Sequence, residues 1–483
     1  MAFGDGLGAG GRGELKPATR VKFFYSLGQM AQSGAFDTAI PFVFFYYTAV
    51  LGLSGGLVGA ALAISLCFDA VVDPLIGSWS DNIGSRLGRR LPLMIAATPP
   101  MCVALGLLFS PPAHLSTPLL FGWLTAASVA VRSLISLFNV PYVALGAEMA
   151  EGYAERSSVV AWRAVAGIAA GVGVTVLAFT VFFAKAPGLL RAQGYPGFGW
   201  SAALALFAAA AICCAGVMRY AARLPRPPTV ATPIWRRLPA EVAEIFRNRS
   251  FRLLFFSAVI FYVAVGANAT LNSHSQIFVW KLAPWMMQAI GYLYLAGILL
   301  GVATTPVLSR RMEKKNTVIV GVVMIILVWI TLPLLRAAGL YAPSGAAALP
   351  PMGFNAFFSG VGVGFVAVAY PSMMADATDE HELLFGARRE GLYFSGLGFA
   401  GKAASGLGVL VGGLALDLLR FPHDAGRPGV VMPESMLNGL ILAWGPGAAV
   451  FGVVAIAVFA PYAITRRRHD AIAADLAARR RAA

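Results

Sequence analysis

Two carboxylates lie close together inside an apolar stretch of the chain. Asp69 and Asp73 are four residues apart, and the residues from about Leu57 onwards are otherwise mostly apolar. This spacing places both side chains on one face of a helix, one turn apart. A carboxylate within a membrane span costs about 2.5–3.5 kcal/mol on insertion scales, and two on one face repel unless a cation or proton lies between them. The pair therefore predicts the coupling-ion site of a membrane transporter.

Other polar side chains recur at helical spacing within apolar stretches. Gln29, Ser33 and Asp37 follow one another at steps of four residues, which gives the first stretch a polar stripe. Asp37, a carboxylate well inside the stretch, is predicted to face a substrate cavity. Asn268 and Asn272 are also four residues apart. These amides are predicted to line a solute pathway, with hydrogen bonding between helices as the alternative.

Three basic residues also lie inside apolar stretches. Arg163 and Lys402 lie deep enough to need an anionic partner, and the carboxylates at 69 and 73 are candidate partners for Arg163. Arg132 precedes Ser136 by four residues and Asn139 by seven, so the three share one side of a helix. Two readings of Arg132 remain open. It faces the cavity, or it lies near the end of its span and extends its head group to water.

The composition excludes an ordinary soluble protein. Of the 483 residues, 58% are hydrophobic and 12% are charged, whereas a soluble domain is about 25% charged. The apolar stretch near the N-terminus has no small-residue cleavage site, so it is predicted to be a retained helix. The four cysteines all lie in apolar stretches and have no metal-type spacing. We expect them to be buried side chains.

The net charge of +15 is distributed as expected for a membrane protein. Of the 37 Lys and Arg residues, three lie inside predicted spans and six lie in the loops on one side of the membrane. The other 28 lie in the two termini and in the loops on the other side. An excess of positive charge marks cytoplasmic segments. Both termini are therefore predicted to be cytoplasmic, and the charge gives no reason to expect a nucleic-acid partner.

The apolar stretches predict an all-α membrane protein with twelve transmembrane helices. A span needs about 20 apolar residues. Twelve stretches qualify, at 21–50, 57–80, 91–110, 117–147, 158–184, 199–222, 251–280, 285–308, 315–337, 350–375, 389–419 and 435–464. A polar segment separates the first six from the last six. We predict a tail at 1–20, six-helix bundles at 21–222 and 251–464, a linker at 223–250 and a basic tail at 465–483.

A short basic loop, 77–92, connects the second and third predicted spans. It is rich in glycine and resembles the signature that the major facilitator superfamily carries at this loop. The matching charged residues are Asp81, Arg86, Arg89 and Arg90. The resemblance implies a gating role, in which Asp81 pairs with an arginine across the cytoplasmic side. The alternative is that the loop is basic only because it faces the cytoplasm.

Several motifs together resemble the glycoside–pentoside–hexuronide:cation symporter family, the melibiose-permease-like branch of that superfamily. They are 45–48 (Phe-Tyr-Tyr-Thr), 68–77, 139–142 (Asn-Val-Pro-Tyr), Arg163, 375–382, Arg388, Glu390 and Lys402. The motif at 139–142 is echoed at 369–372 (Ala-Tyr-Pro-Ser), as Arg163 is by Lys402. The resemblance implies two pseudo-symmetric six-helix bundles around a central cavity, the major facilitator fold.

The resemblance also assigns roles by position. Asp69 and Asp73 match the cation-binding carboxylates, which would hold Na⁺ if sodium is the coupling ion, and Ser136 matches a hydroxyl at the same site. Arg163 matches an arginine near the cavity, and Lys402 a lysine near the cation. This sequence differs from known family members in two respects, so neither the coupling ion nor the transported solute follows from the resemblance. Val72 replaces an asparagine of sodium-using members, and Ser33 and Asn139 replace two aspartates of galactoside-using members.

The sequence thus predicts a secondary symporter that couples inward movement of Na⁺ or H⁺ to uptake of a sugar or glycoside. The solute is expected to be a glycoside, pentoside or uronide, carried by a monomer in the inner or plasma membrane without a cofactor. An enzyme is not expected, because the five histidines form no nucleophile–base or metal arrangement. A cation-coupled lysophospholipid symporter of the same branch is the alternative.

Overall fold

The computed structural model describes residues 17–34, 40–150, 153–224, 241–427 and 430–482. Every regular element among these residues is a helix. Eleven of the helices in this described part are long and apolar enough to cross a membrane, and Pro41–Val50 is a shorter apolar helix. The all-α membrane fold predicted from the sequence is therefore confirmed.

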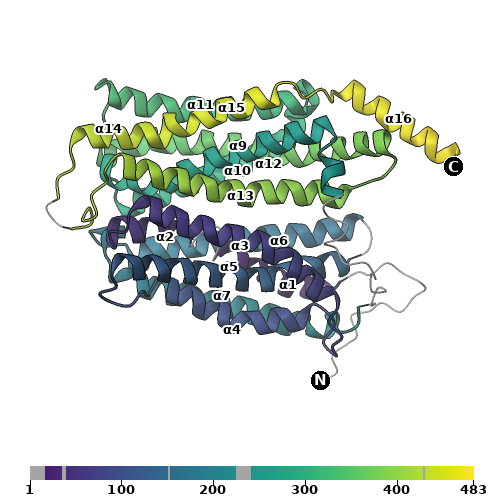
Figure 1. Cartoon of the computed structure of the whole chain (residues 1–483), viewed down its shortest axis with the longest axis horizontal. Coiled ribbons are helices and arrows are strands. Elements are labelled where there is room, and N and C mark those ends of the chain that lie inside the picture. The colour runs from purple at the N-terminus through teal and green to yellow at the C-terminus, as the bar shows by residue number, and fades with distance from the viewer. Residues whose placement is uncertain (1–16, 35–39, 151–152, 225–240, 428–429, 483) are drawn as a thin grey trace. The chain divides into compact units, whose positions relative to one another are not determined.

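The chain divides into two compact units. The first comprises Met1–Leu53 with Ile64–Ala231, and the second comprises Ser54–Ala63 with Thr232–Ala483. In Figure 1 the helices of the first unit run from purple to blue, and those of the second run from teal to yellow. The boundary after Ala231 falls within the predicted linker at 223–250, most of which lies outside the described residues.

The helices of the first unit follow the predicted spans to within about five residues at most ends. They are α1 (Thr19–Gln32), α2 (Ile40–Phe45), η2 (Tyr46–Val50), α3 (Gly55–Asp81), α4 (Leu91–Leu108), α5 (Thr117–Glu148), α6 (Tyr153–Val176), η3 (Leu177–Phe182), η4 (Gly188–Leu190) and α7 (Gly194–Ala221). Helix α3 begins in the residues grouped with the second unit. Pro74 and Pro141 both lie inside helices.

The second unit contains the remaining helices. They are α9 (Arg249–His274), η5 (Ser275–Val279), α10 (Pro284–Met312), α11 (Lys314–Ala337), η6 (Gly345–Ala348), α12 (Leu349–Phe385), α13 (Glu390–Leu418), α14 (Glu434–Leu442), η7 (Ala443–Gly447), α15 (Ala448–Phe459) and α16 (Arg466–Ala482). The predicted basic tail forms α16. Pro371 lies inside α12, as Pro141 does in α5.

The two units repeat the same helix pairings. In the first unit α1 packs on α6 and α7, and α4 packs on α5 and α7. In the second unit α9 packs on α13 and α15, and α11 packs on α12 and α15. When the spans of each half are numbered from one to six, the first packs on the fifth and sixth in both halves, and the third packs on the fourth and sixth. These four shared pairings agree with the internal repeat that the sequence indicated.

Helix α12 continues ten residues beyond its predicted end at 375, because charged partners hold its acidic extension. Lys314 Nζ donates to both carboxylate oxygens of Asp376, at 2.7 and 2.6 Å. Arg468 Nη2, from α16, donates to Glu380 Oε1 at 3.3 Å. Hydropathy marks the apolar part of a helix and not its polar continuation, so the sequence prediction for this helix was too short.

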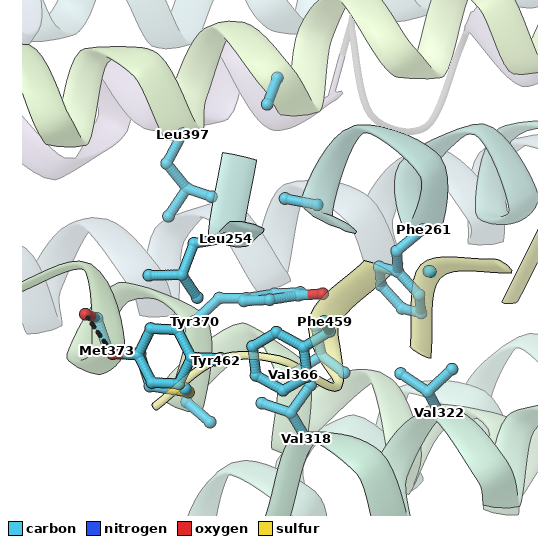
Figure 2. Packing of buried hydrophobic residues seen from close by; sticks show 14 of the residues in the cluster. Leu254, Phe261, Val318, Val322, Val366, Tyr370, Met373, Leu397, Phe459 and Tyr462 are labelled. Atoms are coloured by element: carbon cyan, nitrogen blue, oxygen red, sulfur yellow. Dashed lines mark hydrogen bonds between the residues drawn. The ribbon is translucent and has the colours of Figure 1, made fainter. Parts of the chain in front are cut away.

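The second unit has a continuous apolar core formed by helices far apart in the sequence. Figure 2 shows Tyr370 of α12 near Phe261 of α9 and Phe459 of α15. Ser257 and Tyr370 share a hydrogen bond of 2.8 Å between their hydroxyls, and Tyr462 donates to the carbonyl oxygen of Met373 at 3.4 Å. The hydroxyls of Ser257, Tyr370 and Tyr462 therefore have partners, as burial in an apolar core favours.

Two stacked tyrosines join α1 to α5 in the first unit. The rings of Tyr25 and Tyr142 stack with centroids 4.5 Å apart. Each hydroxyl donates to the main-chain oxygen of the other residue, at 2.9 and 3.0 Å. Glycines lie opposite both rings, with Gly28 against Tyr142 and Gly146 against Tyr25. The helices approach closely because these glycines leave room for the rings.

A methyl group at position 146 is expected to separate these two helices. The Cβ of a Gly146→Ala variant would collide with the Tyr25 hydroxyl. Overpacking of this kind costs about 1–3 kcal/mol, so we expect a lower melting temperature of the purified protein. Gly122→Ala in the same helix is the matched control, because its Cβ meets nothing within 4 Å. Equal melting temperatures for the two variants would contradict the proposed close fit.

Candidate functional site

Asp69 of α3 lies in direct contact with α5. The Ser136 hydroxyl donates to Asp69 Oδ1 at 2.5 Å, and the two residues are 2% and 5% exposed. Arg132, one turn earlier on α5, is also buried and interacts electrostatically with Asp69. An ionised carboxylate in an apolar bundle needs such partners. The structure thus brings together Asp69 and Ser136, which the family resemblance associated with the cation.

Further oxygen-bearing groups lie about one turn along each helix from this contact. Asp73 lies one turn beyond Asp69 on α3 and is half-buried. Pro74 follows it, and its missing N–H leaves the carbonyl of residue 70 without the usual helical donor. Asn139 lies one turn beyond Ser136, and its Oδ1 is enclosed without a hydrogen-bond partner among the described residues. Carboxylate, carbonyl and hydroxyl oxygens are the ligands that a hard cation takes.

Arg132 is buried within the first unit. Its side chain is 6% exposed, and Asp69 is near enough to interact with its charge. Of the two readings left open by the sequence, the structure favours the inward one. The sequence contained the signal in the four-residue step from Arg132 to Ser136, but spacing along one helix does not show how deep that helix lies.

Arg163 of α6 binds a neutral residue. Its Nε and Nη2 both donate to Gln29 Oε1, at 3.1 and 2.8 Å. Its guanidinium also lies over the ring of Tyr142, 5.1 Å from the centroid. The Gln29 amide donates in turn to Ser33 Oγ at 3.3 Å. The carboxylates of α3, offered by the sequence as partners for Arg163, form no ion pair with it in the described part of the chain.

Tyr142 is a residue that the sequence analysis did not single out. It closes the motif at 139–142, and its ring joins two contacts, one with Tyr25 and one with Arg163. A guanidinium over an aromatic face is stabilised by about 0.5–2 kcal/mol. Asp37, predicted for the same cavity, lies outside the described residues. Gln29, Ser33 and Arg163 thus form one connected group on α1 and α6.

The residues of the second unit that were predicted to line the substrate cavity are Asn268, Asn272 and Lys402, and the two asparagines have different hydrogen-bond partners. Asn268 donates to the main-chain oxygen of Trp444 at 2.8 Å, which joins α9 to η7. Asn272 Oδ1 accepts from Gln276 on the same helical stretch at 3.4 Å. Lys402 lies half-buried on α13. Asn268 therefore makes the contact between helices that the sequence left open as an alternative to a cavity position.

The loop between α3 and α4 is fastened by a glutamate. Glu148 Oε1, at the end of α5, accepts from Arg89 Nη2 at 2.6 Å and from Arg90 Nε at 2.9 Å. Arg90 Nη2 also lies 2.6 Å from Asp81 Oδ1. Arg86 is exposed. The partner of Asp81 is therefore an arginine of its own loop in the first unit.

Glu148, which directly follows the predicted span at 117–147, is not a solvated loop residue. The residue belongs to α5, its side chain is 23% exposed, and one of its oxygens binds two arginines. Glu155, seven residues later, lies in α6 and binds Lys22 Nζ at 2.6 Å. The sequence does not distinguish a solvated acidic residue from a paired one at the end of a span, because the basic partner comes from a distant part of the chain.

The comparisons with known proteins agree with this arrangement. The family model described as MFS/sugar transport protein matches residues 24–466. The isoprimeverose transporter of Lactiplantibacillus pentosus is 24% identical over 82% of this chain and 79% of its own length. The glucuronide carrier protein homolog of Escherichia coli (strain K12) is 24% identical over 84% of this chain and 86% of its own.

A solved structure shows the same fold. A bacterial homolog to the human lysosomal transporter Spinster superposes with a TM-score of 0.61 at 12% identity, covering 91% of this chain and 95% of its own. At this identity the likeness concerns the fold alone. It agrees with the major facilitator fold of twelve helices, and the matches support neither an enzyme nor the lysophospholipid alternative. The chain belongs to the MFS/sugar transport protein family, as a multi-pass membrane transporter of the symporter type.

Proposed function

We propose that this transporter couples the inward movement of Na⁺ or H⁺ to the uptake of a sugar-type solute. The observation that supports the proposal is the contact between Asp69 of α3 and Ser136 of α5, which joins a buried carboxylate to a hydroxyl oxygen. A cation or proton bound at Asp69 would neutralise its carboxylate and so weaken the electrostatic interaction between Asp69 and Arg132. The names of the two relatives, one for isoprimeverose and one for glucuronide, support a sugar or sugar conjugate as the solute.

Coupling requires that cation and solute stabilise the same state. If the bound cation makes the solute site competent, the solute must tighten cation binding by the same factor, because linkage is reciprocal. The solute site is proposed to include Arg163, Gln29 and Ser33, which form one hydrogen-bonded group. The loaded carrier then changes the side of the membrane to which the site opens.

The direct test is uptake by the purified full-length protein in proteoliposomes. The panel contains labelled glycosides, pentosides, uronates and lysophosphatidylcholine, each with a Na⁺, Li⁺ or pH gradient. We expect at least one sugar-type solute to accumulate above its external concentration only when a cation gradient is present. Solute entry that reaches the same level without any gradient would contradict coupling. Uptake of the lysolipid alone would contradict a sugar-type solute.

The Ser136 hydroxyl is expected to contribute to cation affinity. Hydrogen bonds to charged groups contribute about 1.5–3 kcal/mol, so Ser136→Ala should raise the half-saturating cation concentration roughly tenfold or more. The measurement is solute uptake against cation concentration. Ser128→Ala is the matched control, since Ser128 is buried on the same helix and its hydroxyl has no hydrogen-bond partner among the described residues. A similar change in both variants would contradict a role for Ser136 at the cation.

A further inference from the structure

The turn between α10 and α11 gathers four basic side chains at one end of the second unit. Arg310 and Arg311 lie in the last turn of α10, and Lys314 and Lys315 open α11. Only Glu313 separates the two helices, and its φ of 71° reverses the chain within one residue. Both helices are long and apolar enough to cross a membrane. The basic side chains therefore lie at the end of two spans, at the level of the lipid head groups.

The start of α16 brings two further arginines to this turn. Arg466 Nη2 donates to the main-chain oxygen of Arg310 at 2.9 Å, and Arg467 follows in the chain. Lys315 Nζ donates to two main-chain oxygens of the connection between α15 and α16, at 2.6 and 3.0 Å, which holds this connection against α11. Arg310, Arg311, Arg466 and Arg467 thus lie at one place, called here the basic corner, and all four are exposed.

The arginines of the basic corner form no ion pair with the described residues, whereas basic side chains beside them do. Lys314 binds Asp376 at 2.6 Å, and Arg468 binds Glu380 at 3.3 Å. The contact of Arg466 with a main-chain oxygen brings no negative charge. The acidic residues of α12 are therefore used by other partners, and the charge of the basic corner faces outward.

A cavity of about 260 Å³ opens beside the basic corner. It is lined by parts of α10, α11, α12 and α16, and Arg466 contributes to its wall. Glu313 and Asp470 line the same cavity and also form no ion pair within the described part of the chain. Four arginines against these two carboxylates leave a net charge of about +2 at this place. The cavity therefore fits a small group with a negative charge and some hydrogen-bond donors.

An exposed apolar stripe on α10 leads to the basic corner. Leu300, Val307 and Arg311 follow one another at steps of seven and four residues, which places them on one face of the helix. Leu300 is 46% exposed and Val307 is 55% exposed. Exposed side chains of this kind on a membrane span contact acyl chains. A ligand that fits both the stripe and the corner has an apolar tail and an anionic head in one molecule.

We propose that the basic corner binds the phosphate of an anionic phospholipid, with the acyl chains along the exposed stripe of α10. Arginine presents paired donors that match phosphate oxygens. Basic clusters that directly follow a membrane span attract anionic lipids, by roughly fivefold in affinity for each Lys or Arg. The carboxylates of Glu313 and Asp470 are available to head-group hydroxyls, which phosphatidylglycerol supplies. This inference is independent of the proposed function, since no residue of the transport site takes part.

The test follows the melting temperature of the purified full-length protein in detergent as lipid is added. Phosphatidylglycerol, phosphatidylethanolamine and phosphatidylcholine with identical acyl chains are compared with glycerol 3-phosphate and inorganic phosphate. A ligand that binds only the folded state raises the melting temperature. We expect phosphatidylglycerol to raise it by several degrees more than the two lipids without net charge, and the soluble phosphates to have no comparable effect. An equal rise with a neutral lipid or with a soluble phosphate would overturn the inference.

A pair of substitutions locates the effect at the basic corner. Arg311→Gln combined with Arg467→Gln removes two charges, and we expect the half-saturating phosphatidylglycerol concentration to rise about tenfold or more. Arg249→Gln combined with Arg252→Gln is the matched control. Both control residues are exposed near the start of α9, which lies at the same end of the unit because α9 and α10 are consecutive spans. Equal half-saturating concentrations for the two double variants would show a non-specific basic surface and overturn the inference.

Conservative variants separate lipid binding from a structural role of the arginines. Arg311→Lys combined with Arg467→Lys keeps both charges and should retain most of the phosphatidylglycerol effect. A purely structural role would lower the melting temperature of the glutamine variant by the same amount in every lipid. The difference between phosphatidylglycerol and phosphatidylcholine would then stay at its wild-type value, and this result would overturn the inference even if the variant were less stable.

Discussion

Replacing Asp69 with asparagine is expected to abolish cation-driven accumulation of the solute. The variant keeps the size of the side chain and its contact with Ser136, whose hydroxyl lies 2.5 Å from Oδ1. It removes the charge that we propose to hold the cation. A membrane potential of about 100 mV supplies roughly 2.3 kcal/mol per transported charge, which corresponds to a concentration ratio of about fifty. We expect this ratio to fall to about one in Asp69→Asn vesicles.

The measurement is the steady-state ratio of solute inside and outside the vesicles, with exchange at equal concentrations measured in parallel. Exchange should continue, because an amide at position 69 resembles the neutralised carboxylate and leaves the proposed solute site on α1 and α6 unchanged. Asp73→Asn should also lose accumulation, since Asp73 lies one turn away on the same helix. Asp470→Asn, at an exposed position of α16, is the control. Wild-type accumulation in both α3 variants would contradict the assignment of the cation site.

Removal of the Glu148 carboxylate is expected to destabilise the first unit. One oxygen of Glu148 binds Arg89 and Arg90, and the Arg90 side chain is only 8% exposed. In a Glu148→Gln variant both arginines lose this anion, although Asp81 remains near Arg90 at 2.6 Å. A buried group left without its partner costs about 1–3 kcal/mol. We therefore expect a lower melting temperature of several degrees in detergent, together with slower transport if the loop takes part in gating.

Glu434→Gln provides a matched comparison for this effect. Glu434 also pairs with an arginine, Arg336, but at 3.5 Å and with 76% of its side chain exposed. Arg336 is itself only 9% exposed, but water screens the exposed carboxylate of Glu434, and such a pair contributes about 0–1 kcal/mol, so its loss should hardly change the melting temperature. Restoration of stability in a Glu148→Gln protein that also carries Arg89→Gln would confirm that the unpaired arginine causes the loss. Equal melting temperatures for the two single variants would show that burial of the Arg90 contact has no consequence.

The helices could be predicted because their signal is local. An apolar stretch of about 20 residues has to be a helix inside a membrane, since its main-chain groups must bond within the segment. The spans at 57–80 and 117–147 were therefore predicted to within two residues of α3 and α5. The same rule failed at the end of α12, where Lys314 and Arg468 hold an acidic extension that hydropathy cannot indicate.

The charges of the site were also visible in the sequence, because a carboxylate or guanidinium in an apolar stretch is rare and costly wherever the helix lies. Asp69, Asp73 and Arg163 were recognised on that ground alone. The contact of Asp69 with Ser136 was implied by the family resemblance, and the structure contains it. The cost of burying a charge depends on depth in the membrane, which the sequence determines through the length and position of each apolar stretch.

The partners of those charges were decided only by the tertiary structure. Arg163 binds Gln29, which is 134 residues away, instead of the carboxylates of α3, and Glu148 binds two arginines of a loop almost 60 residues earlier. Which side chains meet depends on the rotation and crossing of whole helices, and glycines such as Gly146 set how closely those helices approach. Sequence determined that costly charges lie within the membrane. Helix packing determined that Asp69 meets Ser136 and that Arg163 meets Gln29 and Tyr142.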